Sequence, residues 1–180
     1  MTAPVPIRNG SRLSDYAGHA HLAPAVAELR AAARAAAPAL RGRKVWMVNS
    51  TASGGGVAEM LPKLVGLLRE LGVQAEWLVA APPLKGFFPL TKRIHNLIHG
   101  AGRPGFGAGD ARLYARAGRD MAEALARRVG PRDILVVHDP QPLAAGRGWP
   151  TRYVFVFVFV FTPSVNSARF SLSNSATGRS

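Results

Sequence analysis

Apolar residues recur at helical spacing in some stretches of this chain and form short continuous runs in others. Residues 15–40 are rich in alanine and carry Leu22, Val26 and Leu29 close to helical spacing, which predicts a helix. Residues 43–49 form a nearly continuous apolar run, which is typical of a strand buried inside a parallel sheet. The chain is therefore expected to begin with a helical region and to enter its first buried strand after it.

A glycine-rich turn follows this first strand. The turn ends in Ser53 and three glycines, and the apolar positions of residues 57–71 then fall on one helical face that Gly72 closes. Residues 73–80 predict a second strand. A strand, a turn, a helix and a second strand make one right-handed βαβ unit, so the predicted fold class is α/β, with a Rossmann-like parallel sheet flanked by helices.

The second half of the chain shows the same signals less regularly. Residues 81–109 are rich in glycine and proline and predict an irregular segment, within which residues 91–99 can form two helical turns. Residues 110–129 predict a helix and residues 134–137 a third strand. This strand ends in the sequence His-Asp-Pro-Gln-Pro at residues 138–142, where two prolines are expected to hold the turn extended and rigid.

The composition changes after residue 150. Residues 151–180 hold five of the eight phenylalanines and six serines but no acidic residue, and residues 153–161 alternate valine and phenylalanine so that both faces are apolar. Such a strand must be buried on both sides or form an edge that favours aggregation. We therefore divide the chain into an N-terminal helical extension (1–40), a Rossmann-like domain (41–150) and an atypical tail (151–180).

Length and composition restrict the function classes. A chain of 180 residues is about one domain, and without cysteine it can hold neither a disulfide nor a thiolate metal site. No apolar run approaches the ~20 residues of a membrane helix. The N-terminus lacks the apolar segment of a secretory signal, so a cytoplasmic protein without a membrane partner is expected.

The net charge of +13 comes from 23 basic and 10 acidic residues and raises the question of an anionic partner. Nineteen of the basic residues are arginines, which together with the many alanines, glycines and prolines is typical of GC-rich coding sequence. The basic residues are scattered, and no strand motif with interleaved aromatics accompanies them. Nucleic-acid binding is therefore the least favoured hypothesis, whereas sugar nucleotides or sugar phosphates fit the charge equally well.

The first candidate site is the loop of Ser53, Gly54, Gly55 and Gly56 before the second predicted helix. Glycines let a backbone approach a ligand closely, and the free N–H groups at the start of a helix favour an anion. In a parallel sheet this loop lies at the carboxyl ends of the strands, where ligands bind. The pattern matches neither the Rossmann G-x-G-x-x-G nor a Walker loop, so a tight turn without a ligand stays open as the alternative.

The second candidate site is the pair His138 and Asp139, which is expected to face the same crevice from the end of the third strand. A capped histidine at a strand end is the alternative. Lys92, His95 and Asn96 could reach the crevice as sugar or phosphate contacts, or form a solvated basic turn. His95 and His99 are spaced four residues apart, but no third metal ligand accompanies them, so no metal site is expected.

Three segments of the chain resemble one family. Residues 48–61, with the sequence Val-Asn-Ser-Thr-Ala-Ser-Gly-Gly-Gly-Val-Ala-Glu-Met-Leu, are similar to the opening of the retaining trehalose synthases, GT-B glycosyltransferases of family 4. The pairs Phe-Phe at residues 87–88, Thr-Lys at 91–92 and His-Asn at 95–96 are similar to the family's next segment, and residues 137–142 to its third. The motifs occur in family order and at family spacing over about residues 41–145.

This resemblance implies the N-terminal half of a GT-B fold, which binds the acceptor while a second domain binds the nucleotide sugar. It implies transfer of glucose from nucleoside-diphosphate glucose to glucose, forming trehalose with retention and without a cofactor or metal. The three glycines would lie against the transferred sugar and the donor phosphates. His138, Asp139 and Gln141 would line the acceptor pocket, the first two as catalytic residues. The implied partners are sugars, and a homodimer stays open.

The chain also departs from this family. After the third motif the family continues through a strand with a further active-site histidine and then a second Rossmann domain, and residues 151–180 match neither. We therefore interpret the chain as the acceptor-side fragment of a trehalose-forming glycosyltransferase, ending near residue 150 in a foreign tail. A stand-alone sugar or sugar-phosphate binding module without turnover is the alternative.

Overall fold

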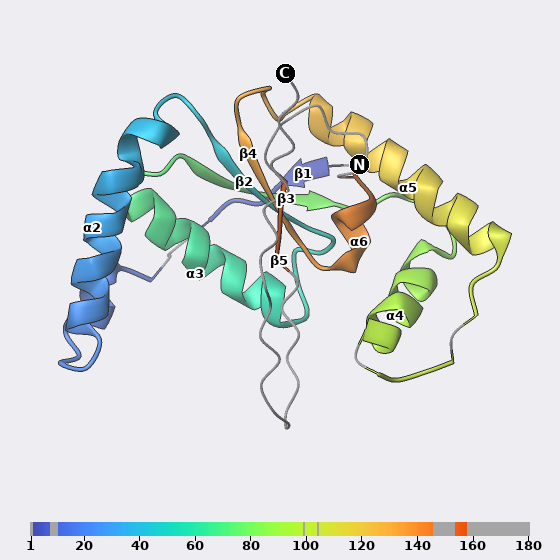
Figure 1. Cartoon of the computed structure of the whole chain (residues 1–180), viewed down its shortest axis with the longest axis horizontal. Coiled ribbons are helices and arrows are strands. Elements are labelled where there is room, and N and C mark those ends of the chain that lie inside the picture. Colours follow the sequence, from blue (N-terminus) through green and yellow to red (C-terminus); the bar gives the residue numbers. More distant parts are fainter. Residues whose placement is uncertain (1, 8–10, 99, 104, 146–153, 158–180) are drawn as a thin grey trace, which may run out of the picture.

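A five-stranded sheet forms the centre of the molecule in the computed structural model, which describes residues 2–7, 11–98, 100–103, 105–145 and 154–157. The strands are β1 (Thr2–Pro4), β2 (Val45–Asn49), β3 (Ala75–Ala80), β4 (Ile134–His138) and β5 (Val154–Phe157), in the spatial order β1-β3-β2-β4-β5 (Figure 1). The pairs formed among β2, β3, β4 and β5 are parallel, and β1 lies antiparallel to β3. The predicted α/β class with a Rossmann-like sheet is confirmed.

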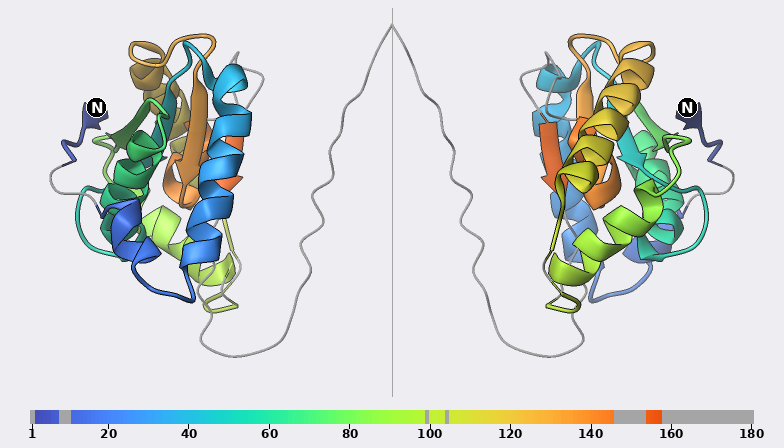
Figure 2. Two further views of the ribbon diagram at one scale, coloured as in Figure 1. Left: turned by 90° about the vertical axis from the view of Figure 1, so that its left-hand side faces the viewer. Right: turned by 90° about the vertical axis from the view of Figure 1, so that its right-hand side faces the viewer.

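Helices cover both faces of this sheet. They are α1 (Leu13–Ala17), α2 (Ala23–Leu40), α3 (Gly56–Glu70), α4 (Phe87–Ile98), α5 (Ala108–Ala126) and α6 (Pro140–Leu143). α2 and α3 lie on one side of the sheet, and α5 and α6 lie on the other with α4 packed against them (Figure 1, Figure 2). Within the described residues, no helix combines the length and the apolar character needed to cross a membrane.

Two predicted helical regions differ from the structure. The helical region expected over residues 15–40 is two helices, because the chain leaves α1 at Gly18 and enters α2 at Ala23, where Pro24 lies in the first turn that suits a proline. The segment 81–109, predicted to be irregular apart from residues 91–99, contains the 12-residue helix α4. α4 begins four residues earlier than expected because Phe87 is buried in the core.

The central strand β2 is buried on both faces. Val45 and Met47 pack on the same side of the sheet as Leu61 of α3, whereas Trp46 and Val48 belong to the core on the side of α5. A one-residue shift of such a strand would exchange its two faces, so the packing specifies its register. The register in turn fixes where β2 ends relative to its neighbouring strands, and therefore where the glycine loop begins.

Asp133 ties the amino ends of β2 and β4 together. Its carboxylate accepts hydrogen bonds from the backbone N–H groups of Lys44 (2.9 Å) and Gly130 (2.8 Å) and from the indole N–H of Trp46 (2.8 Å). Burial alone would raise the pKa of Asp133, but these hydrogen bonds, with the nearby charge of Lys44, outweigh it and hold the pKa below its usual range. The charged carboxylate therefore stabilises the end of the sheet opposite the glycine loop.

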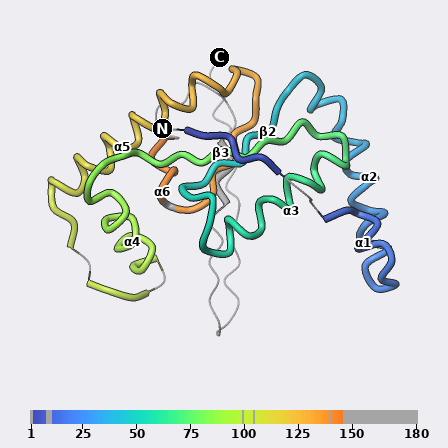
Figure 3. Tube along the Cα trace, turned by 180° about the vertical axis from the view of Figure 1, so that it is seen from behind, coloured from blue at the N-terminus to red at the C-terminus, as the bar shows by residue number. Residues whose placement is uncertain are grey.

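β1 covers one edge of the sheet, beside β3 (Figure 3). Thr2 pairs with Ala80 and Pro4 with Leu78, and the hydroxyl of Thr2 donates a 3.2 Å hydrogen bond to the carbonyl of Ala124 in α5. Residues 2–4 therefore join the sheet to its helical layer. They lie in the extension that was predicted to be helical, and that prediction is wrong for these residues.

β5 extends the opposite edge, beside β4. Val154 pairs with Leu135 and Phe157 with His138 in a parallel ladder. These four residues come from the valine and phenylalanine alternation that the sequence analysis set apart as a tail, and their backbone pairing places them in the sheet. Residues 151–153 and 158–180 of that tail lie outside the described residues.

Candidate functional site

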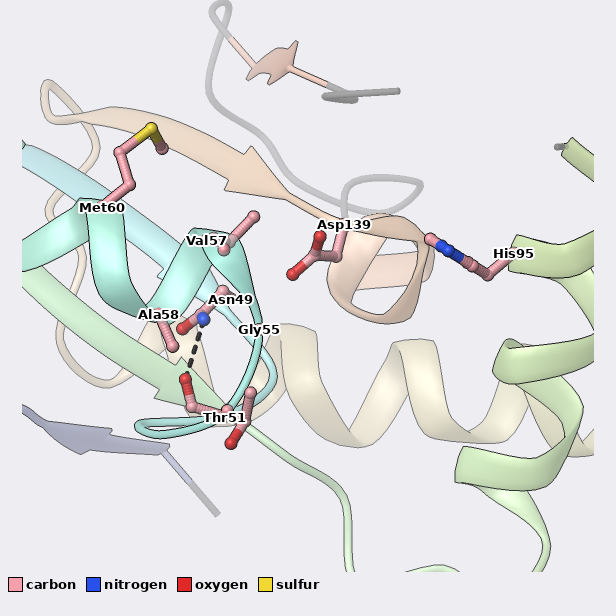
Figure 4. Close-up of a pocket in the computed structure, with 10 residues that line it drawn as sticks. Asn49, Thr51, Gly55, Val57, Ala58, Met60, His95 and Asp139 are labelled. Atoms are coloured by element: carbon pink, nitrogen blue, oxygen red, sulfur yellow. Dashed lines mark hydrogen bonds between the residues drawn. The ribbon is translucent and has the colours of Figure 1, made fainter. Parts of the chain in front are cut away.

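A pocket of about 610 Å³ opens at the carboxyl ends of β2 and β4. Its walls come from the loop after β2, the first turns of α3, the helix α4 and the residue that follows β4 (Figure 4). This edge of an open α/β sheet is where ligands bind. The residues that line it are Asn49, Thr51, Gly54, Gly55, Gly56, Val57, Ala58, Met60, His95 and Asp139.

The glycine loop forms one side of the pocket and leads directly into α3. Gly54 has a φ of +77°, and Gly55, the N-cap of α3, has a φ of +91°. Residues other than glycine rarely adopt these φ values. A Cβ atom built on Gly54, Gly55 or Gly56 would meet no atom within 4 Å. The glycines are therefore required at positions 54 and 55 by conformation, and the space above the loop is open to a ligand.

Asn49 connects this loop to the neighbouring strand. The residue ends β2 and is completely buried. Its side-chain oxygen accepts a 2.8 Å hydrogen bond from the indole N–H of Trp77 in β3, and its side-chain nitrogen donates a 2.7 Å hydrogen bond to the carbonyl of Thr51. The Thr51 hydroxyl in turn donates to the carbonyl of Ser53 (2.6 Å) and accepts from the N–H of Ser53 (3.2 Å). Side-chain hydrogen bonds thus run from the sheet to the residue before Gly54.

Asp139 faces the pocket from the end of β4. Its φ of +71° makes it the one non-glycine residue with a positive φ among those described, and such a conformation costs about 1–3 kcal/mol. Burial raises the pKa of the Asp139 carboxyl, and the charge of His95, which lines the same pocket, opposes that shift. A strained, half-buried carboxyl that opens onto the pocket is suited to accept hydrogen bonds from hydroxyl groups.

The chain after Asp139 does not have the extended, rigid conformation expected from its two prolines. Residues 140–143 form the short helix α6. A proline at the first helical position has no N–H that the helix would leave unpaired, and its fixed φ suits a helix start, so the sequence permits this turn. The helix packs beside β4 and α5 and begins directly after Asp139.

His138 lies in the core rather than on the pocket wall. It is 1% exposed, and its ring nitrogen Nε2 lies 3.4 Å from the sulfur of Met47 in β2. Burial lowers the pKa of His138, so its imidazole is neutral near pH 7. Asp139 leaves the extended strand with its φ of +71° and lines the pocket, whereas His138, the last residue of β4, stays in the core.

The remaining predicted residues lie outside the set that lines this pocket. Ser53 and Lys92 are exposed, on the glycine loop and on α4. Asn96 lines a second cavity of about 330 Å³ farther along α4. Gln141 of α6 is half-buried, and its side-chain oxygen has no hydrogen-bond partner within the described residues.

The pocket also contains residues that the sequence analysis did not select. Three apolar side chains from the first turns of α3 line it, together with Thr51 and Asn49. Asn49 had a usable signal, because it is an amide at the end of an otherwise apolar strand. Among the described residues, no three histidine, aspartate or glutamate side chains gather in a group that could hold a metal ion.

A mostly parallel sheet, a pocket at the carboxyl ends of its strands and a glycine loop at a helix start define a Rossmann-like domain. The family model described as the N-terminal domain of trehalose synthase matches residues 47–159, more than half of the chain, and the chain belongs to this family. The resemblance found in the sequence is thereby confirmed. The match runs from β2 through β5, so it extends into the region that was set apart as a tail.

Two trehalose synthases and a trehalose phosphorylase are among the similar curated proteins. A trehalose synthase of Rubrobacter xylanophilus is 41% identical over 123 residues, which cover 64% of this chain and 29% of that protein. A trehalose synthase of Pyrococcus horikoshii is 40% identical over 105 residues, or 58% of this chain and 25% of that protein. A trehalose phosphorylase of Pleurotus pulmonarius is 32% identical over 105 residues, or 54% and 14%. The chain thus matches 25–29% of the length of these two synthases.

Proposed function

We propose that this chain is the acceptor-side domain of a glycosyltransferase that forms trehalose by transferring glucose from nucleoside-diphosphate glucose to glucose. The observation that carries the proposal is that the glycine loop at the start of α3 and the carboxyl of Asp139 open onto one pocket. Membership of the trehalose synthase N-terminal domain family supports it. The two substrates supply every reacting group, so the proposed reaction uses no cofactor.

The glycine loop suits the anionic side of the reaction. The first N–H groups of a helix have no acceptor within the helix, and the helix dipole favours negative charge there. The α3 helix is 15 residues long, and the glycines at positions 54–56, which lead into it, have no side chains that would cover its first N–H groups. Donors placed in this way would stabilise the negative charge that develops on the leaving phosphate as the bond to the glucosyl C1 breaks.

Asp139 and the apolar wall suit the sugar. A carboxylate accepts hydrogen bonds from hydroxyl groups, and Val57, Ala58 and Met60 offer a surface for the C–H face of a pyranose ring. A pocket of about 610 Å³ lies within the usual range for small-molecule sites. The new bond to C1 would form on the face from which the phosphate leaves, with the acceptor proton passing to a phosphate oxygen.

A second candidate is sugar binding without turnover. It is favoured by the pocket itself, since every lining residue belongs to one domain and the matched family model describes that domain alone. Holding donor and acceptor together is worth about 7–11 kcal/mol of the barrier in well-oriented systems. The 180-residue chain on its own is therefore expected to bind sugar but to form no trehalose.

Sugar binding and product formation by the purified chain test these proposals. We expect millimolar binding of glucose or trehalose by NMR titration and no trehalose from a panel of nucleoside-diphosphate glucoses, with the Rubrobacter xylanophilus synthase as the active control. An absence of sugar binding would overturn both proposals. Turnover by the chain alone that disappears in Asp139→Ala would overturn the acceptor-side assignment, because one domain would then suffice.

A chimera separates the two candidates. Residues 47–159 would replace the matched segment of the Rubrobacter xylanophilus synthase, which supplies the rest of that protein. If this chain is an acceptor-side domain, the chimera should form trehalose and its Asp139→Ala variant should not. A folded chimera that binds the nucleotide sugar and glucose but forms no product would favour the binding module.

A further inference from the structure

We infer that Asn49 is a positioning residue for the glycine loop: its amide, held in place by Trp77, fixes the conformation in which residues 53–56 face the pocket. Trp77 is not among the residues that line the pocket, and its indole N–H bonds to Asn49, which is. The ordering of the loop follows from this chain's own contacts. Its effect on sugar binding rests on the proposed function.

The orientation of the Asn49 amide is set by its two partners. An indole N–H can only donate, so Trp77 must face the amide oxygen, and a backbone carbonyl can only accept, so Thr51 must face the amide nitrogen. Exchanging the oxygen and the nitrogen would place two donors against each other and two acceptors against each other. Because Asn49 is completely buried and Trp77 is 2% exposed, water cannot compensate for the mismatch between these two side chains.

Hydrogen bonds of Thr51 connect the fixed Asn49 amide to the residue before the glycines. The amide holds the Thr51 carbonyl, and the Thr51 hydroxyl holds both backbone groups of Ser53. Gly54 and Gly55 follow immediately, and both adopt positive φ values. Glycines lose more conformational freedom on ordering than other residues, so a loop without these side-chain bonds would have to be ordered by the ligand.

A second tryptophan provides a matched control. Trp46 and Trp77 are both buried, at 7% and 2% exposure, and each indole donates a 2.8 Å hydrogen bond to a side-chain oxygen. The acceptor of Trp46 is Asp133, at the opposite end of the strands. Trp77→Phe and Trp46→Phe therefore remove the same indole N–H donor from the same sheet. Only Trp77→Phe removes a hydrogen bond to Asn49, which contacts the glycine loop.

The test measures the backbone order of Gly54 to Gly56 by ¹⁵N relaxation without ligand, and then the affinity for trehalose. In Trp77→Phe the order parameters should fall from the rigid range of about 0.85 toward values below about 0.6. The affinity should fall about tenfold, because binding must then order the loop. Trp46→Phe should leave both quantities as in the parent.

Variants of Thr51 keep the test decisive if a buried substitution fails to fold. Thr51→Val removes the hydroxyl at nearly constant shape and should lower the order parameters of the loop. Thr51→Ser keeps a hydroxyl and should leave the loop as ordered as in the parent. Unchanged order parameters in both Trp77→Phe and Thr51→Val would overturn the inference, as would a loosened loop with unaltered affinity. If the parent binds no trehalose, the proposed function fails, while the order parameters still decide whether Asn49 positions the loop.

Discussion

Replacing Gly118 by alanine tests whether the packing of α5 against α6 positions the Asp139 side of the pocket. Gly118 is buried in α5, where a Cβ atom would lie 2.7 Å from the carbonyl oxygen of Ala144, 2.8 Å from its Cβ and 2.9 Å from its carbonyl carbon. Ordinary van der Waals contact begins at 3.4 Å, so the shortest of these contacts is too close by 3.4 − 2.7 = 0.7 Å. Backbone atoms cannot rotate away, and the end of α6 must therefore move.

Two opposing free energies decide the sign of the effect on stability. Alanine in a helix interior is favoured over glycine by about 1 kcal/mol. Inserting a methyl group into a tightly packed contact costs about 1–3 kcal/mol. Three contacts below 3.0 Å, two of them with backbone atoms, place Gly118→Ala toward the upper end of that cost. We expect a net loss of about 1–2 kcal/mol in the free energy of unfolding.

Urea unfolding followed by circular dichroism measures this loss, with Gly109→Ala as the control. Gly109 lies in the same helix, but a Cβ there would meet no atom within 4 Å, so the substitution should be neutral or stabilising. Because α6 begins directly after Asp139, Gly118→Ala should also weaken trehalose binding, and Gly109→Ala should not. Equal stability and equal affinity of the two variants would refute the reasoning.

Further predictions concern the loop, the sheet ends and its edge. Gly55→Val places a β-branched residue at a φ of +91°, so sugar binding should disappear while circular dichroism shows a retained fold; affinity within a few-fold of the parent would reduce the loop to a plain turn. Asp133→Asn should lower the free energy of unfolding by about 1–2 kcal/mol at pH 7. Because the folded pKa of Asp133 is lowered, its contribution is complete above the ordinary carboxyl pKa and is lost as the pH falls toward the lowered value. The parent should therefore lose stability below about pH 4 more steeply than the variant, and parallel pH profiles would contradict this. A chain ending at residue 150 loses the β4–β5 ladder and should unfold at lower urea concentration; an unchanged midpoint would mean that β5 adds nothing to the sheet.

The buried strands were predictable because their sequence carries the signal locally. β2, β3 and β4 are short and mostly apolar, with Glu76 as the charged exception in β3, since strands covered on both faces need apolar residues at most positions. β1 gives no such signal, because its three residues include Pro4 and its pairing partner lies in β3. A strand whose existence depends on a distant partner cannot be found from its own residues.

The candidate site was predictable where backbone conformation restricts the residue type. Gly54 and Gly55 could be selected because few other residues adopt their φ values. Asn49 could have been selected as an amide at the end of an apolar strand, but its bond to Trp77, 28 positions away in the chain, could not be predicted. His138 and Asp139 could not be told apart, because a shift of one position at a strand end decides which of the two is buried.

The order of the strands bears on how the chain folds while it is being synthesised. β3 pairs with β2, β4 adds to the other side of β2, and β5 adds to β4, so each of these strands finds its partner already made. β1 is the exception, because Thr2 pairs with Ala80 and its hydroxyl bonds to a carbonyl 122 positions away. Until β3 is made, β1 has no partner, and because it is short and contains Pro4 it can form few incorrect backbone hydrogen bonds with other strands. Pulse-labelling hydrogen exchange should find the first residues of the chain among the last to be protected.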